Sequence, residues 1–260
     1  MRVTPRACII SVILKERMNV NPKHLLIGIV AVALLASAAP AAVYTGSLLY
    51  QDGGAVNTGL VIGSTNPDGW TNYASIAWKV SDQQAGAPAG HPWYYEYTVT
   101  VRKYELSHMI VEASANFAAA DFASLTVNGQ NHSASSIATH QTGPGNPAMP
   151  ADMFGFKIDN LGGGFDAAGQ NVTHVIAFFS DRQPMWGDAY LKCGGFGNRG
   201  WNEGFTAGDI DPTGPISSGS LDGHLLVPDT IPEPATMILL SIGLAGTALG
   251  RRRAWRRPRS

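Results

Sequence analysis

Apolar and polar side chains alternate between Trp93 and Arg102, and this alternation constrains the fold more than any other local feature. The odd positions, from Trp93 through Tyr97 to Val101, are all apolar or aromatic. The even positions are mostly polar, as at Glu96. Successive side chains of a strand point to opposite faces of its sheet, so the segment predicts a strand with one face buried in a core.

Eight further segments have the composition of strands. They are residues 44–50, 76–80, 108–113, 125–127, 154–158, 172–180, 189–192 and 221–227. Residues 175–179 are apolar on both faces, which predicts a central strand covered on each side. Turns rich in glycine and proline separate these segments. The pattern predicts an all-β fold, a single antiparallel β-sandwich that is jelly-roll-like.

The C-terminus combines a proline-bounded apolar run at residues 235–250 with a basic end. Proline is tolerated in the first turn of a helix, so the run predicts a single transmembrane helix that begins at the prolines. The positive-inside rule keeps the arginines in the cytoplasm and the preceding chain outside. The residues that carry this pattern are Pro232, Glu233, Pro234, Arg251, Arg252 and Arg253.

This order of parts resembles the PEP-CTERM sorting signal of bacterial envelope proteins, a tail also catalogued as an ice-binding protein C-terminal domain. The resemblance covers residues 231–259. It implies export, at least transient tethering to the inner membrane, cleavage at the Pro-Glu-Pro element by an exosortase-type enzyme, and a final place in the cell envelope or extracellular matrix. The domain has no regular ranks of threonine, so the ice label is not carried to it.

A permanent membrane anchor is the alternative interpretation of the tail. Sixteen helical residues reach only about 24 Å, against a hydrocarbon core of about 30 Å. The shortfall favours a processing signal.

The N-terminus has the order of a secretory signal peptide. Lys23 and His24 precede an apolar stretch at residues 25–35 and then small residues, which predicts cleavage after Ala41. A start at Met18 would give a cleaner signal. The chain therefore divides into a leader at residues 1–41, an exported domain at 42–230 and the sorting signal at 231–260. Runs such as YASIAWKV and WNEGF make the domain resemble uncharacterised exported domains that travel with this tail.

The exported part is acidic. Residues 42–231 contain seven Lys and Arg against seventeen Asp and Glu, a formal net charge of −10. Such a field repels polyanions, so nucleic acid and anionic lipid are poor candidate partners, while divalent cations and neutral sugars remain candidates. Cys193 is the single cysteine of this part, which leaves no intramolecular disulfide and favours a buried or incidental cysteine over a thiol that joins two chains or reacts.

An acidic turn is the candidate metal site. Asp209 and Asp211 offer oxygens at alternate positions before a glycine, so with Asp222 or a distant carboxylate they are candidate ligands for one Ca²⁺. An ordinary solvated turn is the alternative. None of the six histidines of the domain has the spacing of a transition-metal motif.

Tryptophans give the strongest binding signal. Trp70, Trp186 and Trp201 fall in turn-rich or glycine-rich segments, where a flat indole can stack on the C–H face of a sugar ring. Tryptophan also fills sandwich cores, as we expect of Trp78 and Trp93.

We therefore expect a non-enzymatic exported protein with a structural or adhesive role, without a resident cofactor unless Ca²⁺ binds. An extracellular hydrolase of matrix polysaccharide is one alternative, because paired carboxylates cannot be recognised from spacing; Glu96, Glu112 and Glu203 are its candidate acids. A calcium-dependent carbohydrate-binding module is the other.

Overall fold

The computed structural model describes residues 42–51, 56–64, 69–162, 169–194, 197–208 and 210–230. The predicted leader, the predicted membrane helix and Asp209 lie outside these residues. The described part is antiparallel throughout its named sheets, apart from one isolated parallel bridge, and its one helix is the short 3₁₀ turn η3 (Ala119–Asp121). The all-β prediction is therefore confirmed.

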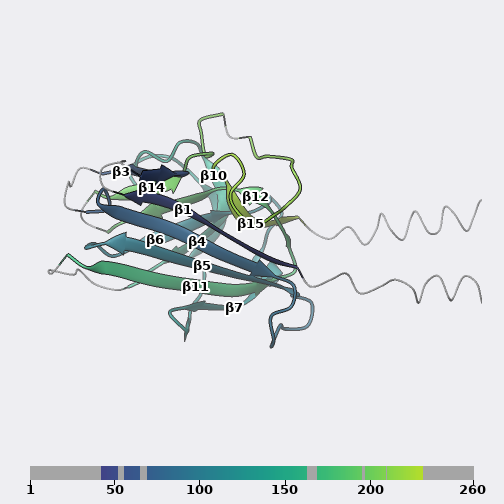
Figure 1. Cartoon of the computed structure of the whole chain (residues 1–260). Coiled ribbons are helices and arrows are strands. Elements are labelled where there is room, and N and C mark those ends of the chain that lie inside the picture. The colour runs from purple at the N-terminus through teal and green to yellow at the C-terminus, as the bar shows by residue number, and fades with distance from the viewer. Residues whose placement is uncertain are drawn as a thin grey trace, which may run out of the picture. The chain divides into compact units, whose positions relative to one another are not determined.

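Seven strands form the larger sheet (Figure 1). In spatial order they are β2 (Val56–Thr58), β1 (Val43–Gln51), β4 (Tyr73–Ser81), β5 (Trp93–Arg102), β11 (Asn171–Ser180), β7 (Phe122–Val127) and β8 (Gln130–Asn131). The long strands β1, β4, β5 and β11 pair over nearly their whole length. They make one broad surface with an inner and an outer face.

Six strands form the second sheet, and two more form a small ribbon. The second sheet runs β3 (Leu60–Gly63), β14 (Arg199–Asn202), β13 (Ala189–Lys192), β6 (His108–Glu112), β10 (Met153–Asp159) and β9 (Ser136–His140). The ribbon pairs β12 (Gln183–Gly187) with β15 (Leu225–Thr230). Both larger sheets contribute to one hydrophobic core, so they pack face to face as a sandwich. The similarity to a jelly roll stays a prediction.

The core follows the alternation of β5. Tyr95, Tyr97, Val99 and Val101 are fully buried, which confirms the predicted inner face. Strands β1 and β4 approach closely where Gly46 lies opposite Trp78. A Cβ on this glycine would come within 2.1 Å of the indole ring. Trp78 is buried, as expected, whereas Trp93 is partly buried.

Strand β11 is central, as predicted, because it pairs with β5 on one side and β7 on the other. Its second face differs from the prediction. Ile176 and Phe178 point into the core, but Val175, Ala177 and Phe179 are only half-buried. Among the described residues no further sheet packs on that face, so the apolar run reflects aromatic and β-branched pairing along the sheet rather than two covered faces.

Strand β15 begins later than the predicted segment at residues 221–227. Leu221 to His224 instead form a tight turn, in which the His224 N–H donates to the Leu221 carbonyl at 2.9 Å. The φ angles of Asp222 and Gly223 are 49° and 78°, the combination of a type I′ turn. An Asp-Gly pair favours this turn, so local turn chemistry overrode the apolar pattern.

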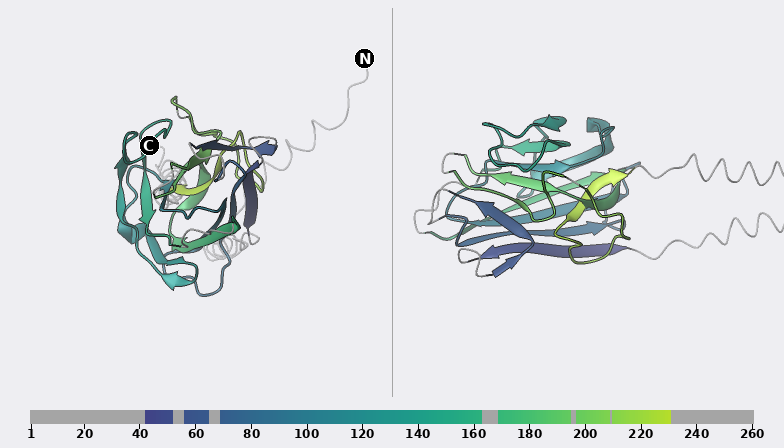
Figure 2. Two further views of the ribbon diagram at one scale, coloured as in Figure 1. Left: turned by 90° about the vertical axis from the view of Figure 1, so that its left-hand side faces the viewer. Right: turned by 90° about the horizontal axis from the view of Figure 1, so that it is seen from above.

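The first and last described strands reach the same end of the sandwich. Figures 1 and 2 show the start of β1 and the end of β15 at this same end. Within the described residues, no helix is long and apolar enough to cross a bilayer.

Candidate functional site

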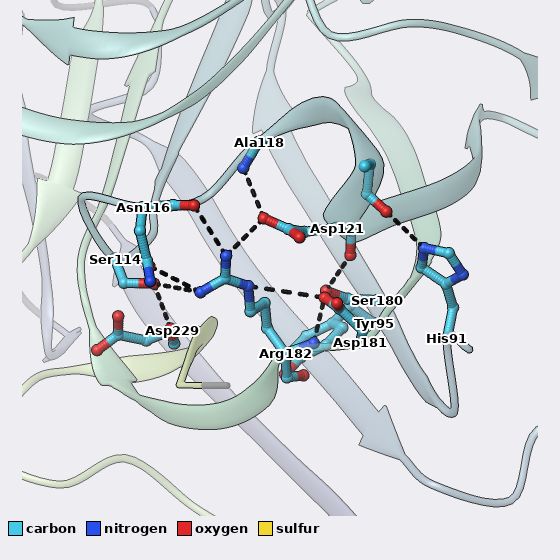
Figure 3. A network of polar contacts seen from close by, with 11 residues as sticks. His91, Tyr95, Ser114, Asn116, Ala118, Asp121, Ser180, Asp181, Arg182 and Asp229 are labelled. Atoms are coloured by element: carbon cyan, nitrogen blue, oxygen red, sulfur yellow. Dashed lines mark hydrogen bonds and ion pairs between the residues drawn. The ribbon is translucent and has the colours of Figure 1, made fainter. Parts of the chain in front are cut away.

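A buried arginine organises the end of the domain from which the tail leaves. Arg182 lies between β11 and β12 and is 2% exposed. Its guanidinium donates to Asp121 Oδ2 at 2.5 Å and to the side chain and carbonyl of Asn116 at 2.8 and 2.9 Å (Figure 3). A further hydrogen bond of 3.0 Å reaches Ser114 Oγ. Four hydrogen bonds and an adjacent carboxylate compensate the buried charge.

The same network holds the last strand. The Ser114 hydroxyl, which accepts from Arg182, donates in turn to the carbonyl of Asp229 in β15. Burial, and then the nearby charge of Asp121, raise the pKa of Asp181, although Arg182 opposes this rise. Strand β15 ends at Thr230, the last residue that the structure describes.

Trp70 and Trp186 do not lie on the surface. Trp70 is fully buried in the turn before β4, where its indole N–H donates to the Tyr104 carbonyl at 3.0 Å. Trp186 is 1% exposed in β12 and donates to the Pro215 carbonyl at 3.4 Å. A buried indole cannot stack on a sugar, so for these two residues the structure opposes the predicted carbohydrate contact. They act as core residues because loops close over them.

Trp201 keeps partial exposure. It lies in β14, opposite Tyr190 of β13, and packs against a small second core that includes Phe205. Among the three predicted contact residues it is the one that an external ring can reach.

The acidic turn lies against two residues from distant parts of the chain. Oxygen and nitrogen atoms of Asp188, Asp211 and His224 lie within 4.8 Å of one another. Asp188 is fully buried and His224 is 3% exposed, while Asp211 is half-buried. Asp222, the ligand suggested by proximity in the sequence, is exposed and lies outside this cluster. The calcium prediction allowed a distant carboxylate as a third ligand. In the fold, Asp188 supplies a carboxylate in this position, and the imidazole of His224 lies beside it.

The backbone positions of Asp188 and His224 are set by the strands and the turn that flank them. Asp188 is the single residue between β12 of the ribbon and β13 of the second sheet. Its N–H donates to Glu112 Oε2 at 2.8 Å, and its carbonyl accepts from the Glu112 N–H at 3.0 Å. His224 closes the type I′ turn directly before β15. Strand geometry therefore fixes both backbones before any side chain is considered.

Hydrogen bonds then orient the side chains. Asn202, itself fully buried, donates to Asp188 Oδ1 at 2.5 Å and accepts from the Ala189 N–H at 2.8 Å. The imidazole Nδ1 of His224 lies 3.3 Å from the Leu221 carbonyl, and its Nε2 lies 3.6 Å from Asp188 Oδ1. Among the described residues, His224 Nε2 has no hydrogen-bond partner.

Other buried histidines are neutral core residues. Burial lowers the pKa of His140 and His174, and it lowers the pKa of His108 to about 4 with help from the positive charge of Lys157. The backbone N–H of Leu106 donates to His174 Nε2 at 3.4 Å, which requires an unprotonated nitrogen. Burial also places Cys193 in the core, as predicted.

The candidate hydrolase acids lie in different parts of the fold. Glu96 is on the outer face of the seven-stranded sheet, where it accepts from the Tyr94 hydroxyl at 2.6 Å. Glu112 ends β6 beside Asp188, and Glu203 is exposed in the turn after β14. A surface cavity of about 430 Å³ contains one carboxylate, that of Asp159, and a second of about 380 Å³ contains none.

Comparison with protein families identifies a sorting motif near the C-terminus of the chain. The PEP-CTERM protein-sorting motif matches residues 230–254. The chain carries this sorting signal. The match confirms the predicted tail, including the Pro-Glu-Pro element and Arg251 to Arg253, and marks the chain as an exported protein that an exosortase-type enzyme recognises. No curated protein and no solved structure matches the chain. The resemblance of the domain itself to other exported domains stays a prediction.

Proposed function

We propose that the domain is a non-enzymatic surface protein with a structural or adhesive role in the envelope or extracellular matrix. The observation that carries this proposal is the sorting motif at residues 230–254, which begins where β15 ends. A short apolar helix would tether the protein to the inner membrane until an exosortase-type enzyme cuts at Pro232 to Pro234.

The outer face of the seven-stranded sheet is the proposed contact surface. Its central strands present short polar side chains side by side: Ser75, Thr100 and Thr173 occupy one cross-strand row. The Thr100 and Thr173 hydroxyls lie 3.0 Å apart. A broad face of hydroxyls can exchange hydrogen bonds with a neutral polysaccharide without an enclosed cavity.

Aromatic rings complete this surface near the tail end of the sandwich. Tyr94 of β5 and Phe179 of β11 are half-buried neighbours with ring centroids 5.2 Å apart, and Lys79 lies over the Tyr94 ring. Half-exposed rings of this kind supply the stacking surface first assigned to Trp70 and Trp186. The net charge of −10 disfavours nucleic acid and anionic lipid as partners.

Intact-mass measurement on fractionated cells tests the routing. Removal of residues 1–41 and cleavage near Pro232, in envelope or medium, is the expected result. A mass that includes the tail, confined to the inner membrane, would support the permanent anchor instead.

A matched pair of variants tests the adhesive role. Thr98→Lys places a long charged side chain in the middle of the hydroxyl-bearing outer face, and Ser217→Lys adds the same side chain to an exposed loop. We expect Thr98→Lys to release the protein from isolated matrix at least tenfold more readily than wild type, and Ser217→Lys to behave as wild type. Equal retention of both would remove the outer face as the adhesive surface. Shortening of matrix polysaccharide by the purified wild-type protein would favour the hydrolase alternative.

A further inference from the structure

We propose that Asp188, Asp211 and His224 together bind one divalent transition-metal ion. Their ligand atoms lie within 4.8 Å of one another, and His224 Nε2 is 3.6 Å from Asp188 Oδ1. Ligands about 2.1 Å from a tetrahedral metal lie about 3.4 Å apart, so the imidazole and Asp188 already stand near the required separation. The three residues come from the β12–β13 junction, the acidic turn and the start of β15.

The orientation of His224 is the observation that points to a cation. A proton on Nδ1 is satisfied by the Leu221 carbonyl at 3.3 Å, which leaves the Nε2 lone pair facing the carboxylate of Asp188. The ring is 3% exposed and Nε2 has no hydrogen-bond partner among the described residues. A buried lone pair aimed at a buried carboxylate is repulsive unless a cation lies between them. A carbonyl on the far nitrogen is also the usual partner of a metal-bound histidine.

Supporting contacts hold the ligands in place from behind. Asn202 donates to Asp188 Oδ1, and Glu112 accepts from the Asp188 N–H. The His224 ring lies against the backbone of Gly204, where a Cβ would come within 2.2 Å of the ring. Gly223 also packs against Gly204, because a Cβ on Gly223 would lie 2.7 Å from the Gly204 nitrogen. Two glycines thus make the space that the imidazole occupies.

The donor set selects the class of metal. Ca²⁺ takes oxygen ligands, whereas one imidazole nitrogen with two carboxylates suits Zn²⁺ and its first-row neighbours. The burial of Asp188 and His224 encloses the ion on the side of the core, and half-buried Asp211 closes it from the loop. An ion in this position links the acidic loop to β13 and β15. The site would therefore stabilise the fold.

The test uses the exported protein, purified without a histidine tag from cells that produce the full chain, and stripped with chelator. Zn²⁺ is the probe, with binding followed by calorimetry, metal content by mass spectrometry and stability by thermal melting. We expect one Zn²⁺ per chain, a higher melting temperature with Zn²⁺, and a smaller effect of Ca²⁺. His224→Gln and Asp211→Asn should each weaken Zn²⁺ binding at least tenfold. Asp211 is half-buried, so its variant keeps the test valid if changes at the core positions prevent folding.

Asp222→Asn is the matched control. This residue adjoins His224 in the sequence but is exposed, and asparagine tolerates its positive φ. It should bind Zn²⁺ as wild type does. Three outcomes would overturn the proposal: no Zn²⁺ binding by the folded protein, equal loss in Asp222→Asn, or full binding in His224→Gln. The first would mean that a doubly protonated His224 forms an ion pair with Asp188. Preference for Ca²⁺ that depends on Asp209 would restore the calcium loop.

Discussion

Stability toward mild acid should depend on His108. This side chain is 3% exposed in β6, and burial lowers its pKa from 6.5 to about 4. Lys157 and Lys192 act in the same direction, while Asp159, with a carboxylate oxygen 3.7 Å from Nδ1, opposes them. A histidine whose pKa is lower in the folded state stabilises the fold above pH 6.5. That contribution is lost as the pH falls from 6.5 toward 4, because the unfolded chain takes up the proton first.

The size of the effect follows from the two pKa values. A tenfold difference in proton affinity corresponds to about 1.4 kcal/mol, so a pKa of about 4 instead of 6.5 is worth about 3 kcal/mol in full. Between pH 7 and pH 5 the wild-type protein should lose about 2 kcal/mol of its unfolding free energy through this group. Carboxylates titrate mainly below this window. His140 and His174, whose pKa values are also lowered, add to the loss.

Urea unfolding of the purified exported protein at pH 7, 6 and 5 measures this dependence. His108→Gln removes the titrating group, so the loss of stability between pH 7 and pH 5 should shrink by about 2 kcal/mol. Ile110→Val, on the same strand, is the control. It should cost about 1 kcal/mol at every pH and leave the pH dependence unchanged. If His108→Gln loses as much stability between pH 7 and pH 5 as wild type, burial does not hold this histidine neutral and the reasoning fails.

Three further substitutions test the packing. Arg182→Met removes the guanidinium that donates to Asp121 and to the Asn116 carbonyl and should lower the urea unfolding free energy by about 3–5 kcal/mol, whereas Arg102→Met on an exposed strand end should change it by under about 0.5 kcal/mol. Gly46→Ala should lower the melting temperature, at a cost of about 1–3 kcal/mol, because its Cβ meets the Trp78 ring; Gly145→Ala, in open space, should not. Tyr97→Phe removes the hydrogen bond of 2.8 Å to the Leu226 carbonyl and should cost about 1–2 kcal/mol, with faster hydrogen exchange in β15 than in β4. Unchanged exchange in β15 would mean that this bond does not dock the ribbon.

The long strands were predictable because their signal is local. In β5 the alternation alone identifies the inner face, and the structure buries Tyr95, Tyr97, Val99 and Val101. Strands β12 and β14 lack such a signal: β12 contains Pro184 and Gly187, and β14 has only four residues, one of them glycine. Their pairing is imposed by neighbours, β15 for one and β3 with β13 for the other.

The sequence located the turn that contains Trp70 but did not reveal that the tryptophan is buried. Trp70 does lie in a turn, but the carbonyl that binds its indole belongs to Tyr104, thirty-four residues away. Loop residues are expected at the surface, and this expectation fails where a second loop supplies a hydrogen-bond acceptor in the core. Only the pairing of β4 with β5 brings these two loops together.

Strand β15 connects the proposed metal site to the sorting tail. His224 stands directly before the strand and Asp229 near its end, where the Arg182 network holds it through Ser114. The proposed ion would link His224 to Asp188, directly before β13. The hydrogen bonds of Arg182 and Ser114 link Asp229 to the end of β11. The strand would then be held at both ends, directly before the sorting motif at residues 230–254. The ligand spacing could not reveal this, because residues 188, 211 and 224 share no motif and meet only when the ribbon docks on the second sheet.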